Sequence, residues 1–329
     1  MSRWLKSFSI VLFSIIAFAT FISVNGVQYV LAYLGNEFAN PLPDLSEFQI
    51  TPERHFDECT SQPISVMTYN VEYGSQFIEE MAATFLHGDT GGALPWSQRA
   101  PEIRERIASY APHLIGLQET HTDEDIHNIV SPNDYTLVSY HRGAFQYGDA
   151  ALLFRKDKFN LLTSGQLWLG PTPDLPMSFG FKRLAMVRYA NWALLKEKNS
   201  HFQFLFVNTH FDNASVNKEP SADLFKQRIS TLAKGIPIIV TGDFNSTATT
   251  ERYQKILGSE PQLLFNVFSL SHAVATTPEL HPDQRIDHIL AGGPCQISSD
   301  LWFIDTRPLA NGQRMSDHDA IIARLQFKP

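Results

Sequence analysis

The pattern of apolar and polar positions divides this chain of 329 residues into two parts. Residues 7–36 contain no charged side chain, and the stretch from Phe8 to Val24 is almost entirely apolar. From about Ile64 onward, short apolar runs typical of strands alternate with stretches of helical periodicity. Many short strands mixed with a few helices predict an α/β fold in a single domain.

The long apolar segment near the N-terminus predicts a membrane anchor or a secretion signal. A spanning helix needs about 20 apolar residues, whereas a cleaved signal is shorter and ends at small residues such as Gly26. Basic residues precede the segment and acidic residues follow it, which places the rest of the chain outside the cytoplasm. We expect an anchor or signal over residues 1–36, a linker over 37–62 and the folded domain over 63–329. The protein would be a single-pass membrane protein, or secreted or periplasmic after cleavage.

Individual elements follow from the same periodicity. Helices are predicted over Pro101–Tyr110 and Ser221–Lys234. Strands are predicted over Ile64–Asn70, His113–Gln118, Ala150–Arg155, Leu161–Trp168, Met186–Leu195, Phe202–Asn208, Ile236–Thr241, Leu301–Asp305 and Ala320–Phe327.

Charge and cysteine content limit the classes of function that the chain can have. The formal net charge is −8, and nucleic-acid binders usually carry a basic face, so a small phosphate ester is favoured over nucleic acid. The two cysteines, Cys59 and Cys295, are too few for a disulfide scaffold or a local zinc cluster. They fit either one disulfide, if the chain is exported, or two buried thiols.

Polar side chains that can carry chemistry follow several of the apolar runs. Taken alone, each could be a turn or cap residue. Together they suit hydrolysis of a phosphate ester, which requires neutralised phosphoryl oxygens, an activated water and a proton for the leaving oxygen. These residues are Asn70, Glu72, Glu119, Asn208, His210, Asp243, Asn245, Asp287, Asp317 and His318.

The motifs TYNVE, LQET, NTHFDN, TGDFNS, RIDHI and SDHDA, in this order from about Val66, resemble the signature of the endonuclease/exonuclease/phosphatase superfamily. The segments YGDAALLFRKDKF and LWLGPTPD are similar to an exported bacterial branch. The resemblance implies a four-layer α/β/β/α sandwich of two mixed sheets flanked by helices, preceded here by an N-terminal hydrophobic helix. It also implies a monomeric, Mg²⁺-dependent phosphoesterase. Alternatives are a nuclease acting on extracellular DNA or RNA, a sphingomyelinase-like lipid phosphodiesterase, and a non-catalytic binding protein.

The resemblance also implies where a metal ion binds. Glu119 is the expected main ligand with Asn70 beside it, since Mg²⁺ prefers one or two carboxylates plus waters. Glu72 and Asp317 are further candidate ligands, with a role as hydrogen-bonding scaffold as the alternative. Mn²⁺ is the alternative ion.

The remaining roles concern proton transfer and phosphate binding. His318, oriented by Asp287, is expected to act as a base or to stabilise the phosphate, and Asp243 is the other candidate base. His210 is expected to protonate the leaving oxygen with Asp149 as its partner, although Asp149 also fits a turn. The residues expected to hold the phosphate are Asn208, Asn245 and Arg188.

Overall fold

The computed structural model describes residues 12, 14–16, 59–74, 94–139, 149–174, 178, 181, 188–233, 235–258, 263–271, 274–275 and 284–329. The predicted N-terminal helix lies outside these residues except for Leu12 and Ser14–Ile16, which are helical and exposed. Within the described residues, no helix combines the length and apolar character that crossing a membrane requires. The division of the chain at residues 36 and 62 stays a prediction.

The first of two mixed sheets has the strand order β10-β12-β13-β1-β2-β4-β3 within the described residues. Its central strand β1 is parallel to β2 and antiparallel to β13. The strands are β1 (Ile64–Gly74), β2 (Leu114–Thr120), β3 (Tyr135–Val138), β4 (Leu152–Arg155), β10 (Val274–Ala275), β12 (Gln296–Asp305) and β13 (Ala320–Lys328).

The second sheet has the strand order β5-β6-β7-β8-β11-β9. Here β7 and β8 are parallel, whereas β8 and β11 are antiparallel. The strands are β5 (Phe159–Trp168), β6 (Tyr189–Glu197), β7 (Gln203–His210), β8 (Ile238–Asp243), β9 (Leu264–Asn266) and β11 (Asp287–Gly292).

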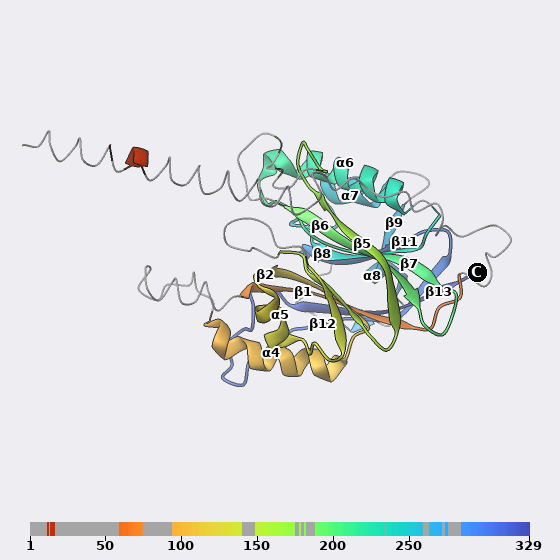
Figure 1. Ribbon diagram of the computed structural model, residues 1–329, viewed down its shortest axis with the longest axis horizontal. Coiled ribbons are helices and arrows are strands. Elements are labelled where there is room, and N and C mark those ends of the chain that lie inside the picture. The colour runs from red at the N-terminus through yellow and green to blue at the C-terminus, as the bar shows by residue number, and fades with distance from the viewer. Residues whose placement is uncertain are drawn as a thin grey trace, which may run out of the picture.

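Helices cover the outer face of each sheet, and the two inner faces pack together, which confirms the predicted four-layer fold (Figure 1). The longer helices α4 and α6 lie on opposite outer faces. In α4, Trp96, Ala100, Ile103 and Ile107 recur at helical spacing and are buried against the first sheet. The helices are α4 (Trp96–Tyr110), α5 (Asp123–Ile129), α6 (Ser215–Leu232), α7 (Glu251–Leu257) and α8 (Val267–Leu270).

Both predicted helices begin earlier in the structure than the sequence predicts. The first begins at Trp96 rather than at Pro101, and the second begins at Ser215 with Pro220 inside it. A proline removes one intrahelical hydrogen bond, and in α4 the burial of Trp96 and Ala100 before the proline and of Ile103 after it outweighs this loss. Pro101, within the second turn of α4, was therefore misinterpreted as lying near the helix start.

The core between the sheets contains the disulfide and a glycine that permits close approach. Cys59 and Cys295 are bonded to each other, so the disulfide is the correct alternative of the two left open by the sequence. A Cβ atom on Gly116 of β2 would lie 2.1 Å from Thr241 Oγ1 of β8 in the facing sheet. Glycine is therefore required where the two sheets come closest.

Candidate active site

The register of the second sheet aligns three of the predicted site residues. His210 ends β7, Asp243 ends β8 and Asp287 begins β11, and these residues are direct neighbours across the three strands. All three are at least 95% buried. The strand pairing alone therefore forms a row of an imidazole and two carboxylates at one end of this sheet.

The first sheet contributes Asn70 from β1 and Glu119 from β2. The Nδ2 atom of Asn70 donates to Glu119 Oε1 at 3.1 Å and to Asp243 Oδ2 at 3.2 Å. One buried amide therefore links the two sheets at the site. The predicted proximity of Asn70 and Glu119 is confirmed, while their role as metal ligands stays a prediction.

The backbone has unusual conformations around this junction. Glu72, Glu119 and Asn245 have φ values of 49°, 58° and 46°, and Ala150, next to Asp149, has a φ of 64°. Non-glycine residues rarely adopt this left-handed region, and such conformations concentrate at functional sites. Here they redirect the chain where the strands reach the site.

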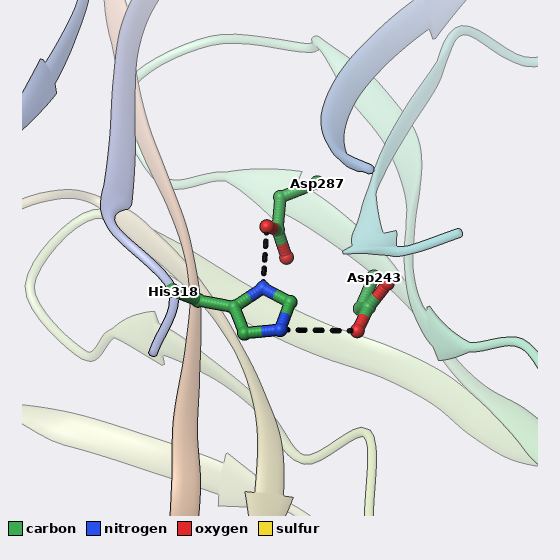
Figure 2. Close-up of side chains that lie close together, drawn as sticks. All are labelled: Asp243, Asp287 and His318. Carbon is green, nitrogen blue, oxygen red and sulfur yellow. Dashed lines mark hydrogen bonds and ion pairs between the residues drawn. The ribbon is translucent and has the colours of Figure 1, made fainter. Parts of the chain in front are cut away.

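His318 lies between two carboxylates (Figure 2). Its Nδ1 atom is 2.6 Å from Asp287 Oδ2 and its Nε2 atom is 3.8 Å from Asp243 Oδ2. Burial alone would lower the pKa of His318, but the hydrogen bond and charge of Asp287, with Asp243 and Asp317, raise it to about 10. In this environment the imidazole is protonated at neutral pH and is suited to stabilising negative charge.

His210, Asp149 and Arg188 form a second buried group. His210 Nδ1 lies 3.0 Å from Asp149 Oδ1, and Arg188 donates from Nη1 to Asp149 Oδ2. Burial favours the neutral acid, yet His210 and Arg188 hold the pKa of Asp149 well below its usual range. Asp149 also accepts a hydrogen bond from the backbone N–H of Glu119 at 2.9 Å, so this carboxylate supports both sheets.

Asp243 is at the centre of these contacts. Its Oδ2 atom is 3.4 Å from His210 Nε2, and its Oδ1 atom accepts from the backbone N–H of Asn245 at 2.7 Å. Burial and the nearby charge of Asp287 raise the pKa of Asp243, and the two imidazoles partly oppose the shift. Asn245 also places its Nδ2 atom 3.3 Å from His210 Nε2.

Glu72 and Asp317 lie on the side of the site next to His318. Glu72 Oε2 accepts from the backbone N–H of Asp317 at 2.9 Å, and Asp317 Oδ1 is 3.9 Å from His318 Nε2. Burial and the charge of Asp317 raise the pKa of Glu72. Ser316 supports this side because its hydroxyl donates to the backbone carbonyl of Asn70 at 2.7 Å.

Asn208 differs from the other residues predicted to hold the phosphate, because its amide is fully used in hydrogen bonds within the protein. Its Nδ2 atom donates to the backbone carbonyls of Leu117 and Ala151, and its Oδ1 atom accepts from Gln118 and Thr241. These bonds use both donors and both lone pairs of the fully buried amide. Asn208 therefore links the two sheets beneath the site, while its role in phosphate binding stays a prediction.

The side chains fit a hard divalent cation by two observations. Carboxylate oxygens of Asp243 and Asp287 lie within 4.8 Å of each other, beside the imidazole of His318, which is protonated at neutral pH and does not itself offer a ligand atom. The Oδ1 atom of Asp287 is buried without a hydrogen-bond partner among the described residues, and such a carboxylate oxygen suits an ion or its bound water. The predicted ligands flank this group, with Glu119 and Asn70 on one side and Glu72 and Asp317 on the other.

Two buried arginines that support the site were not predicted. Arg99 donates to the backbone carbonyls of Val71, Glu72 and Met315, and Arg252 donates to those of Phe244 and Asn245. Arg99 thus holds the end of β1 and the segment before β13, and Arg252 holds the segment that follows β8. The sequence signal that could have identified Arg99 is its helical spacing. Arg99 lies four residues before the buried Ile103, which places it on the apolar face of the helix.

Comparisons with known proteins agree with this site. Residues 67–318 match the model of the Endonuclease/Exonuclease/phosphatase family. Human Nocturnin is 25% identical over 261 residues, which cover 74% of this chain and 56% of that protein. This chain therefore spans little more than half the length of that relative.

Solved structures share the fold. A family protein from Bacteroides thetaiotaomicron superposes with a TM-score of 0.67 at 22% identity, covering 82% of this chain and 99% of that one. A mannosyl-6-phosphatase from Bacteroides thetaiotaomicron VPI-5482 gives a TM-score of 0.66 at 23% identity, covering 80% and 99%.

This chain belongs to the endonuclease/exonuclease/phosphatase family. The family unites nucleases and phosphatases, which hydrolyse phosphate ester bonds, and its members typically use divalent metal ions. The family expected from the sequence is thereby confirmed, whereas the reaction, the bond cleaved, the ion and the location are matters of proposal.

Proposed function

We propose that this protein is a Mg²⁺-dependent phosphoesterase that hydrolyses a phosphodiester or phosphomonoester bond outside the cytoplasm. The observation that carries the proposal is the convergence on Asp243. Asn70 links this carboxylate to Glu119, and His318 approaches it while being held by Asp287 at 2.6 Å. Acid, amide and imidazole groups from both sheets thus surround one position where a phosphoryl group can bind.

A divalent ion bound through Glu119, with Asn70 beside it and Glu72 and Asp317 as further ligands, would neutralise charge on the phosphoryl oxygens. Mn²⁺ is the alternative to Mg²⁺. The raised pKa of His318 supports a protonated imidazole that stabilises the same charge from the protein side.

We assign proton transfer to residues of the second sheet. The raised pKa of Asp243 suits a carboxylate that takes a proton from the attacking water. His210, held by Asp149, is placed to give a proton to the leaving oxygen. Arg188 and Asn245 have N–H donors beside His210 and can hold the phosphate.

A location outside the cytoplasm is supported by the disulfide between Cys59 and Cys295, because structural disulfides persist mainly in oxidising compartments. The uncharged segment at residues 7–36 agrees with export through an anchor or signal. We therefore assign the chain to the exported bacterial-type branch of the family, attached to the membrane or released from it, with a monomeric catalytic domain.

A small phosphate ester is the favoured substrate. The net charge of −8 disfavours a long nucleic acid, and one structural neighbour is a mannosyl-6-phosphatase. Nuclease activity and sphingomyelinase-like lipid cleavage are the other outcomes of a substrate panel containing plasmid DNA, RNA, sphingomyelin, nucleotides and sugar phosphates.

The test is turnover of p-nitrophenyl phosphate and bis-p-nitrophenyl phosphate with and without EDTA. We expect EDTA to abolish turnover and Mg²⁺ to restore it. Glu119→Gln should lower kcat/KM by about 100-fold or more, whereas Glu105→Gln, the same change at an exposed position of α4, should have no effect. Turnover that survives EDTA, or equal activity of the two variants, would contradict the proposal.

A further inference from the structure

A hollow of about 290 Å³ opens directly beside the catalytic imidazole. Its walls are two short segments, residues 284–287 and 317–319, which also carry Asp287 and His318. The volume is just below the roughly 300–1,000 Å³ of sites that enclose a whole small molecule. The hollow therefore has room for one ring-sized group attached to the phosphate.

Arg285 is the main side chain in this hollow without a role in the proposed chemistry. Its side chain is 10% exposed, and its Nη2 atom is 3.5 Å from Asp319 Oδ2, which is the limit of a hydrogen bond. Its Nε atom is buried without a hydrogen-bond partner among the described residues. A buried guanidinium with an unused donor is costly unless something else binds it.

The link between Arg285 and Asp319 joins the same two segments as the catalytic pair. Asp287 contacts His318 at 2.6 Å, and Arg285, two residues earlier, approaches Asp319, one residue after His318. The hollow consequently begins at the imidazole that faces the phosphate. The alcohol portion of a phosphate ester is the part of the substrate that reaches it.

The charges of the hollow decide what kind of group it takes. Apart from the hydrogen-bonded pair of Asp287 and His318, the charged side chains that line the hollow are one arginine, Arg285, and two carboxylates, Asp317 and Asp319. A site for a second phosphate would need an excess of positive charge, which this lining lacks. The adjacent donor of Arg285 and acceptor of Asp319 instead match hydroxyl groups, which donate and accept at the same time.

We propose that Arg285 and Asp319 bind the hydroxyl groups of a polyhydroxylated alcohol esterified to the scissile phosphate, such as a hexose or a ribose. This inference rests on the proposed phosphoesterase function and names its substrate class. Arg285 donates to a hydroxyl oxygen, and Asp319 accepts from the neighbouring hydroxyl. Gln284, exposed at the edge of the hollow, offers a further donor and acceptor.

The experiment compares kcat/KM for substrates that differ in hydroxyl groups. Mannose 6-phosphate supplies the hydroxyl groups of a hexose, and ribose 5-phosphate supplies those of a ribose. The reference substrate is p-nitrophenyl phosphate, whose alcohol portion has no further hydroxyl group. In Arg285→Met, the ratio of kcat/KM for the sugar phosphate to that for the reference should fall about tenfold or more, since one lost hydrogen bond to a charged group is of that size. The loss should appear mainly in KM, and Arg285→Lys should recover part of it.

The control is Arg324→Met, the same change at an exposed ion pair with Asp300 that does not line the hollow. Its substrate ratio should equal that of the wild type. Thermal unfolding of each variant separates a folding defect from a binding defect.

The outcomes separate the two proposals. An unchanged ratio in Arg285→Met, with Mg²⁺-dependent hydrolysis of the reference intact in the wild type, overturns the hydroxyl subsite and leaves the phosphoesterase function standing. A larger loss for fructose 1,6-bisphosphate than for fructose 6-phosphate would show a second-phosphate site and also overturn the inference. A wild type that hydrolyses none of these esters overturns both.

Discussion

Replacing Arg99 by methionine should remove a structural link beneath the active site. Arg99 is 1% exposed in α4 and donates from Nε to the carbonyl of Leu94 at 2.7 Å. It also donates to the carbonyls of Val71 at 2.6 Å, Met315 at 2.8 Å and Glu72 at 2.6 Å. One side chain thus connects the segments that carry the residues on the His318 side of the site.

The size of the effect follows from those four hydrogen bonds. A buried acceptor that loses its partner costs about 1–3 kcal/mol, partly offset because methionine removes the cost of burying a charge. We expect a loss of about 4 kcal/mol in the free energy of unfolding. At roughly 2–4 °C per kcal/mol for a domain of this size, Tm should fall by about 10 °C.

The assay pairs thermal unfolding with turnover of p-nitrophenyl phosphate well below both midpoints. The control is Arg104→Met, five residues further along α4, where an exposed guanidinium donates to the carbonyls of His127 and Asn128 at 3.2 and 3.4 Å. That change should cost no more than about 0.5 kcal/mol. The reasoning is refuted if the two variants lose the same stability, or if Arg99→Met keeps the kcat/KM of the wild type.

Two further predictions concern stability. Replacing Cys59 and Cys295 by serine should destabilise the protein by about 2–5 kcal/mol in urea unfolding, because the bond closes a loop with a sequence separation of 236 residues; an unchanged midpoint would contradict this. Burial lowers the pKa of His288 to about 4 from an unfolded value of 6.5, so its neutral form contributes stability above pH 6.5 that is lost as pH falls towards 4. The loss should approach about 3 kcal/mol, and His288→Gln should flatten this part of the pH profile of unfolding.

The part of the site that could be predicted from the sequence lies in contiguous strand-end motifs. His210 and Asp243 each end an apolar run that becomes a strand, and strand pairing aligns them with Asp287, which begins β11. The hydrophobic pattern was therefore sufficient for His210 and Asp243. The strand β11 was not predicted, so Asp287 was found from the RIDHI motif alone, and the four-layer fold followed from the order of the motifs.

The supporting arginines could not be predicted in the same way. Arg99 and Arg252 bind backbone carbonyls, which every residue has, so no side-chain motif marks their partners. Arg99 contacts Met315, which is distant in sequence, and this contact depends on how α4 and the segment before β13 pack. Only an arginine on the apolar face of a helix hints at such a role, because burying that charge requires acceptors.

The position of Asn208 shows what a strand-end motif leaves undetermined. Asn208 and His210 are two residues apart on β7, as are Thr241 and Asp243 on β8, so each pair projects from the same face of the sheet. The members at the strand ends form the site. Asn208 and Thr241, two residues further from the strand ends, bind each other, since Thr241 Oγ1 donates to Asn208 Oδ1 at 3.0 Å. Gln118 Nε2 donates to the same oxygen at 2.7 Å. The active site therefore lies where the row of polar side chains between the two sheets ends. Only the packing of the sheets determines which of these side chains lie at that end.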